Sequence, residues 1–75
     1  MMMTKFIIQM TPEARPDLKY FYAGIGRSGC PVFELKKSRA KRYDFIEEAD
    51  RDMRILAAVD EMEETFKVKT IRCRT

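Results

Sequence analysis

One segment constrains the fold of this chain more than any other, because it has the pattern of a long amphipathic helix. Residues 45–62 contain neither glycine nor proline, and apolar residues recur on one face: Ile46, Ala49, Met53, Leu56 and Ala57. Asp44 and Glu47 have the spacing of a capping box, which predicts that the helix begins at Phe45. Two acidic and basic pairs are spaced for contact along this helix: Glu47 with Arg51 and Asp50 with Arg54.

Four other segments have the patterns of β-strands, because they alternate apolar and polar residues or are rich in aromatic ones. They span residues 4–10, 18–25, 31–36 and 65–73. In the last of them the alternation slips between Val68 and Ile71. A bulge near Lys69 and Thr70 would return the apolar side chains to one face, and we predict one there.

These elements predict an α+β fold of order β-β-β-α-β, a four-stranded and mainly antiparallel sheet covered on one face by one helix. We expect the strand order third, second, first, fourth, with the fourth strand reached by a right-handed crossover and parallel to its neighbour. Residues 1–75 form a single domain, because a chain of this length is shorter than most domains. The predicted core consists of Phe6, Ile8, Met10, Val32 or Phe33, Ile46, Ala49, Met53, Leu56, Phe66 and Val68.

The residue types argue against most catalytic chemistry. The chain has no histidine and only two serines, so the commonest general base and the usual nucleophile and base pairs are missing. Cys30 and Cys73 lack the further sulfur and nitrogen ligands that a structural zinc needs. In the expected sheet they lie ~20 Å apart, too far for a disulfide. We therefore predict a non-enzymatic protein with reduced thiols and without catalytic residues, cofactor or metal.

The distribution of apolar residues gives no sign of export or of a membrane span. Residues 1–8 lack the apolar stretch and the small-residue cleavage site of a signal peptide. No later stretch approaches the ~20 apolar residues that cross a bilayer. We expect a cytoplasmic protein that does not enter a membrane.

Residues 24–29 match the G-x-G-x-x-G string of dinucleotide-binding proteins. In those proteins a helix begins at the string, and its amides bind the pyrophosphate. Here the following residues, 30–33, continue as a strand. We therefore interpret the three glycines as a hairpin turn.

Five positive charges lie within seven positions, and they are the candidate nucleic-acid-binding residues: Lys36, Lys37, Arg39, Lys41 and Arg42. Tyr20 or Tyr22 would add a ring on which a base stacks. The competing interpretation is a solvated connector that the helix neutralises. Residues 44–64 hold nine of the twelve acidic residues and two basic ones, a net charge of −7 that leaves +10 on the rest.

A sheet covered on one face leaves aromatic residues of the other face exposed. This exposed set would contain Ile7 and one of two pairs, either Tyr20 and Tyr22 or Phe21 and Ile25. It would form a contact patch for a protein partner or for a second copy in a homodimer. The acidic helix face offers a second surface for a basic partner. The candidate partner-binding residues are Tyr20, Tyr22, Glu47, Glu48 and Asp52.

Several short strings together resemble a recurrent pattern of small phage and prophage proteins: Tyr20-x-Tyr22-x-Gly24, Pro31-Val32-Phe33, Ala40-Lys41-Arg42-Tyr43 and Glu47-Glu48-Ala49. The resemblance covers roughly residues 20–50 and implies a β-sheet with one helix in a mobile-element context. It carries over no catalytic or binding residue. From it we expect a protein-binding module of phage type, such as an inhibitor of a host factor or defence system, with the nucleic-acid-binding protein as the alternative.

Overall fold

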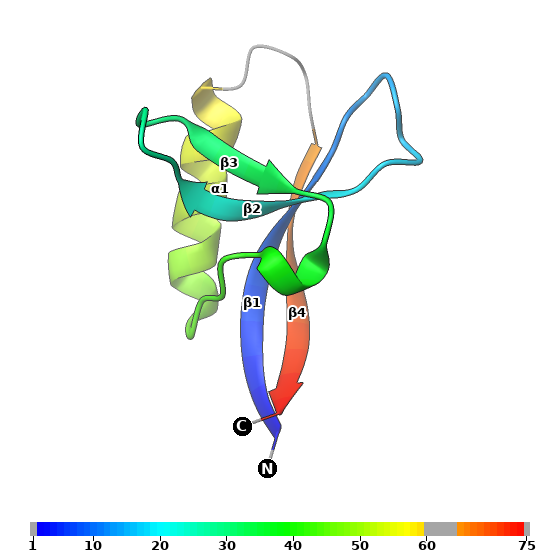
Figure 1. The fold of residues 1–75 in the computed structure, drawn as a ribbon. Helices are drawn as coiled ribbons and strands as arrows, with labels where there is room; N and C mark the ends of the chain where they lie inside the picture. The colour runs from blue at the N-terminus through cyan, green and yellow to red at the C-terminus, as the bar shows by residue number, and fades with distance from the viewer. Residues whose placement is uncertain (1, 60–64, 75) are drawn as a thin grey trace.

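The computed structural model describes residues 2–59 and 65–74 of the chain. Its elements follow the predicted order (Figure 1): β1 (Met2–Thr11), β2 (Tyr20–Ile25), β3 (Pro31–Glu34), the 3-10 helix η1 (Lys37–Arg39), α1 (Ile46–Val59) and β4 (Thr65–Arg74). The strands form one sheet in the order β3-β2-β1-β4, with α1 packed on one face. The predicted α+β fold and strand order are confirmed.

The direction of β4 differs from the prediction, because β4 runs antiparallel to β1 rather than parallel to it. The chain reverses before the helix begins. After η1 it returns along β1, where Phe6 and Tyr43 form an antiparallel bridge with backbone N to O distances of 2.9 and 2.8 Å. α1 therefore begins near the N-terminal end of β1. β4 begins opposite Thr11, the last residue of β1, and runs back along β1 in the opposite direction. The crossover rule for two strands joined by a helix does not apply to such a path.

The pairing of β4 with β1 is regular over its whole length, from Thr65 opposite Thr11 to Arg74 opposite Met2. The predicted bulge in β4 is therefore wrong. Since side chains alternate along a regular strand, β4 offers apolar residues first to one face of the sheet and then to the other. Phe66 and Val68 pack on the side of α1, and Ile71 packs on the opposite side, which we call the outer face.

The larger core lies between the sheet and α1. Its buried members come from four segments: Ile8, Tyr22, Tyr43, Ala49 and Leu56. Half-buried residues pack around them: Phe6, Phe33, Met53, Phe66 and Val68. The ring of Phe33 lies 5.9 Å from that of Tyr22 and 6.3 Å from that of Phe66, between centroids. Most of the predicted core is confirmed, with Phe33 rather than Val32 packed in it, but Ile46 is 48% exposed and does not belong to it.

A smaller core lies on the outer face, which the sequence analysis expected to be open. Ile7, Phe21 and Ala40 are buried there, and Ile71 packs against them. Ala40 directly follows η1, so the connector between β3 and α1 covers this part of the sheet. The predicted contact patch of Ile7 with Phe21 is therefore absent from the surface.

The start of α1 lies one residue later than predicted. The carbonyl oxygen of Phe45 accepts hydrogen bonds from the amides of Glu48 and Ala49, so Phe45 holds the N-cap position. The carboxylate of Asp44 instead accepts a hydrogen bond from the ammonium of Lys5. α1 is described to Val59, and the predicted last turn at residues 60–62 lies outside the described residues.

Of the two ion pairs predicted along α1, one is confirmed. Arg54 Nε lies 2.9 Å from Asp50 Oδ2. Arg51 instead has its Nε 3.9 Å from Asp52 Oδ1.

The glycine string forms the turn between β2 and β3, as predicted. The amide of Gly26 donates to the carbonyl of Cys30 at 2.9 Å, and the amide of Gly29 donates to the carbonyl of Gly26 at 3.0 Å. Gly29 has a φ of +83°, a conformation that favours glycine in tight turns. β3 begins directly afterwards at Pro31, so no helix starts at this string to hold a pyrophosphate.

The cysteines are not bonded to each other. Cys30 precedes β3 at one edge of the sheet and Cys73 lies in β4 at the other edge, and both are free thiols. Three strand spacings of ~4.8 Å separate the two edges, so the sheet order excludes a disulfide between them. Among the described residues no helix is long and apolar enough to span a membrane.

Candidate functional site

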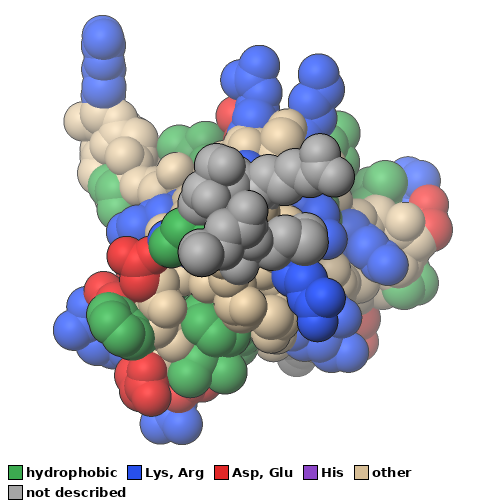
Figure 2. Space-filling model, turned by 90° about the horizontal axis from the view of Figure 1, so that it is seen from below, with side chains coloured by type: hydrophobic (Ala, Val, Ile, Leu, Met, Phe, Trp, Pro, Cys, Tyr) green, Lys and Arg blue, Asp and Glu red, His purple; other side chains and the backbone are tan. Residues whose placement is uncertain are grey.

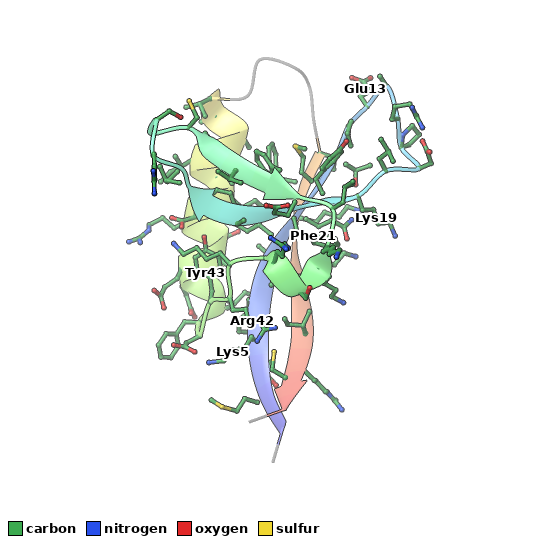
Figure 3. The ribbon with its side chains drawn as sticks, viewed as in Figure 1. Lys5, Glu13, Lys19, Phe21, Arg42 and Tyr43 are labelled. Atoms are coloured by element: carbon green, nitrogen blue, oxygen red, sulfur yellow. The ribbon has the colours of Figure 1, made fainter. Side chains whose placement is uncertain are left out.

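A shallow groove lies between the connector and the end of β4, where this edge strand offers residues of both faces of the sheet. We call it the basic groove; its volume is about 580 Å³, and it is lined by Lys37, Ser38, Arg42, Thr70, Ile71, Arg72 and Cys73. Three of its seven lining residues are cationic, and they come from two segments far apart in the sequence. Figure 3 shows Arg42 on the side of the sheet that carries η1, below Phe21.

The backbone of the connector is held in place on both sides of these cations. η1 closes with hydrogen bonds from Arg39 to Lys36 and from Ala40 to Lys37, of 3.0 and 3.1 Å. The Ala40 side chain is buried in the outer core, and the bridge at Tyr43 ties the other end to β1. Lys37 and Arg42 therefore project from a fixed backbone rather than from a free loop.

The cations of the basic groove have no acidic partner among the described residues. The ion pairs within residues 2–59 and 65–74 involve five other cations: Lys5, Arg15, Lys41, Arg51 and Arg54. Lys37, Arg42 and Arg72 thus keep a net positive potential on the groove, and so does Lys69 on the same strand.

Among the described residues, the predicted neutralisation of the basic segment by the acidic helix is found for Lys41; four of the nine acidic residues of 44–64 lie outside them. Lys41 Nζ lies 3.8 Å from Asp52 Oδ2 and 5.0 Å from the centre of the Tyr43 ring. No other cation of the basic segment forms an ion pair with a carboxylate of residues 46–59. In Figure 2, acidic and hydrophobic side chains gather together at the lower left, while lysine and arginine side chains project over much of the remaining surface.

The structure divides the five predicted nucleic-acid-binding residues among three places. Lys37 and Arg42 line the basic groove. Lys36 and Arg39 line a separate shallow groove with the half-buried Tyr20. Lys41 turns toward α1.

Tyr22 offers too little exposed surface to stack with a base. Its side chain is only 4% exposed and packs in the core under α1. Burial, followed by the nearby charge of Asp52, raises the pKa of Tyr22. The predicted aromatic platform on β2 is therefore reduced to Tyr20.

Sequence reasoning missed Arg72, the third cation of the groove. Arg72 lies 30 residues after Arg42 and 35 after Lys37 in the sequence. The pairing of β4 with β1 brings it to the same groove. The only local signal was the presence of Lys67, Lys69 and Arg72 in the last strand, and a site could not be predicted from it without the position of the connector.

The candidate residues of the acidic helix have different surroundings. Glu47 and Glu48 are exposed on the first turn of α1. Asp52 is half-buried, and its Oδ2 accepts a hydrogen bond of 2.7 Å from the hydroxyl of Tyr43. Burial, this hydrogen bond and the charge of Asp52 raise the pKa of Tyr43, so its hydroxyl stays protonated and holds α1 to the connector.

A second groove has mostly apolar walls and lies between α1 and the β2–β3 hairpin. We call it the apolar groove; its volume is about 380 Å³, and it is lined by Tyr22, Ile25, Gly29, Pro31, Lys41, Asp52, Ile55, Leu56 and Val59. Ile25, Ile55 and Val59 are each more than half exposed. Exposed apolar side chains that cluster in this way are typical of a contact surface.

Within residues 2–59 and 65–74, no three acidic or cysteine side chains converge as a metal site would require.

Comparisons with protein-family models, with curated proteins and with solved structures found no match. The candidate functional features of the described residues are therefore the two grooves and the charges around them.

Proposed function

We propose that this chain is a small, non-enzymatic nucleic-acid-binding protein that holds phosphates in the basic groove. The observation that carries the proposal is the convergence of Lys37, Arg42 and Arg72 on one groove without an acidic partner among the described residues. Such cations bind phosphates chiefly by releasing the counterions of the nucleic acid. Hydroxyls from Ser38 and Thr70 line the same groove and can donate further hydrogen bonds to phosphate oxygens.

The residues of the groove favour binding over catalysis. The chain has no histidine, and the described lining of the groove offers no carboxylate that would act as a general base. The hydrogen-bonded pair of Tyr43 and Asp52 belongs to the helix-side core rather than to this groove. Lysine, arginine and hydroxyl groups around an open surface are suited to contacts with a polyanion.

The proposal is tested by removing two of the three cations. We expect the double variant Lys37→Gln/Arg42→Gln to bind a fluorescent 20-nucleotide DNA about tenfold more weakly than the wild type at low salt. Fluorescence anisotropy measures both affinities, and circular dichroism confirms that the variant is folded.

The matched control changes the same charge elsewhere. Arg27 is exposed in the turn between β2 and β3 and lines neither the basic nor the apolar groove, so Arg27→Gln should retain nearly the wild-type affinity. Equal losses for Arg27→Gln and for the groove variant would show a diffuse charge effect and contradict the proposed site.

The second candidate function is the protein-binding module of phage type, such as an inhibitor of a host factor. The apolar groove favours it, because Ile25, Ile55 and Val59 offer exposed apolar contacts to a partner's apolar side chain. A nuclease-treated pulldown should then capture one host protein with the wild type and lose it with Ile55→Glu. Retention of that protein by Ile55→Glu would exclude the apolar groove as its docking site.

A further inference from the structure

The paired ends of β1 and β4 project from the body of the molecule as a two-stranded ribbon (Figure 1). Beyond Lys5, where the side-chain contact with Asp44 ties β1 to the connector, three residue pairs continue the ladder: Met2 with Arg74, Met3 with Cys73 and Thr4 with Arg72. At ~3.4 Å per residue these three pairs extend the ribbon by ~10 Å. We call this part the projecting ribbon.

The projecting ribbon begins at the edge of the basic groove. Arg72 and Cys73 belong to both, and Lys37 and Arg42 lie on the other wall of that groove. Thr4 and Arg72 are exposed, and Met3 is 43% exposed on the outer face. In DNA-binding proteins, a two-stranded ribbon can enter a groove of the duplex while nearby cations bind the phosphates that flank that groove. The projecting ribbon and the cations at its base have this arrangement.

The described part of the outer face lacks the rings that bind single strands. Single-stranded nucleic acids are held by stacking their bases on exposed aromatic side chains. Phe21, the aromatic residue of the outer core, is buried under the connector. A ligand on this face must therefore be recognised by its backbone and its shape.

We infer that the projecting ribbon enters the major groove of B-form duplex DNA while Lys37 and Arg42 contact the flanking phosphates. The major groove is ~12 Å wide and ~8.5 Å deep, and it admits a two-stranded ribbon of about this reach. The major groove of duplex RNA is too deep and narrow for side chains to read. This inference rests on the proposed function and adds the class of ligand to it.

The acidic residues near the start of α1 fix the side on which the duplex lies. Asp44, Glu47 and Glu48 are exposed there, and phosphates would be repelled from them. η1 and the outer core lie on the other face of the sheet, and Lys37 and Arg42 line the basic groove beside them. The phosphate backbone therefore runs over η1 and the end of β4, away from α1.

The test compares three ligands of one sequence with the full chain: duplex DNA, its single strand and duplex RNA, each of 20 nucleotides per strand. We expect the affinity for duplex DNA to exceed the other two affinities by about tenfold or more, as measured by fluorescence anisotropy at one salt concentration. Methyl green, which occupies the major groove, should displace the protein, whereas netropsin, which occupies the minor groove, should not.

A variant of the ribbon locates the contact. Met3→Glu places a carboxylate on the projecting ribbon without emptying either core, and it should weaken duplex binding by about tenfold or more. Ile55→Glu makes the same charge change on α1 and should leave duplex binding nearly unchanged.

The outcomes separate the inference from the proposed function. Equal affinity for the three ligands, lowered by Lys37→Gln/Arg42→Gln, would overturn the duplex inference and leave phosphate binding standing. Displacement by netropsin alone, or an unchanged affinity of Met3→Glu, would also overturn it. No binding to any of the three ligands would overturn both.

Discussion

Tyr43 joins three parts of the molecule through one residue. Its backbone bridges Phe6 in β1, its ring packs in the helix-side core, and its hydroxyl donates to Asp52 in α1. Lys41 lies over the same ring and near the same carboxylate. This residue therefore fixes both the entry into α1 and the position of the connector that carries Lys37 and Arg42.

The hydroxyl of Tyr43 gives a prediction that depends on pH. Burial and the hydrogen bond to Asp52 raise its pKa above the ordinary 10.0, so the folded state favours the protonated form. The resulting stabilisation is fully present below pH 10 and is lost as the pH rises above that value, because the unfolded chain ionises first.

We expect Tyr43→Phe to lower the free energy of unfolding by about 1 kcal/mol at pH 7, where the hydrogen bond is intact. The difference from the wild type should shrink above pH 10. Urea unfolding at pH 7 and at pH 10.5 measures it for both proteins. A difference that stays the same at both pH values would show that the hydroxyl is not the titrating group.

At the scale of elements, the connector between β3 and α1 covers the outer face of the sheet. It buries Ile7, Phe21 and Ala40 together and gives Ile71 a place to pack. Because the connector covers the outer face, β4 can place apolar residues on both faces of the sheet. It therefore needs no bulge, and its register is regular.

The outer core is tested by truncating its most buried side chain. Ile7 is fully buried, so Ile7→Ala should lower the free energy of unfolding by about 2 to 5 kcal/mol. Ile25 is more than half exposed, and Ile25→Ala should cost about 0.5 kcal/mol or less. Chemical denaturation of both variants gives the comparison. Similar small losses for the two would contradict the covered outer face.

The elements themselves were predictable from the sequence, and their packing was predictable only in part. Period-two strands and the apolar stripe of the helix are local patterns, so the fold class, the strand order and most of the helix-side core follow from them. The direction of β4 depends on the bridge between Phe6 and Tyr43, a contact between distant residues that no local pattern indicates. The same contact decides that the outer face is covered.

The candidate site shows the same limit. The basic segment was visible as a run of charges, but its division among three surfaces depends on the turn of η1 and on the burial of Ala40. Arg72 joins Lys37 and Arg42 only through the pairing of β4 with β1. Tyr22, which the strand pattern offered as a stacking ring, is buried because α1 covers its face of the sheet.

At the scale of the whole molecule, the charges are unevenly distributed, although α1 also carries the exposed Arg51 and Arg54. α1 and its first turn carry exposed carboxylates, whereas the basic groove and the projecting ribbon carry cations on and beside the outer face. Such a separation orients a small protein as it approaches a polyanion. The expected homodimer stays a prediction, and the sheet face through which it was expected is covered by the connector.

The most direct test of this account is the salt dependence of duplex DNA binding. Four phosphate contacts, from Lys37, Arg42, Lys69 and Arg72, would make the affinity fall by about 100-fold between 50 and 200 mM salt. With Lys37→Gln/Arg42→Gln two contacts remain, and the fall should be about tenfold. An affinity that does not change with salt, or the same salt dependence for the wild type and the double variant, would contradict phosphate binding in the basic groove.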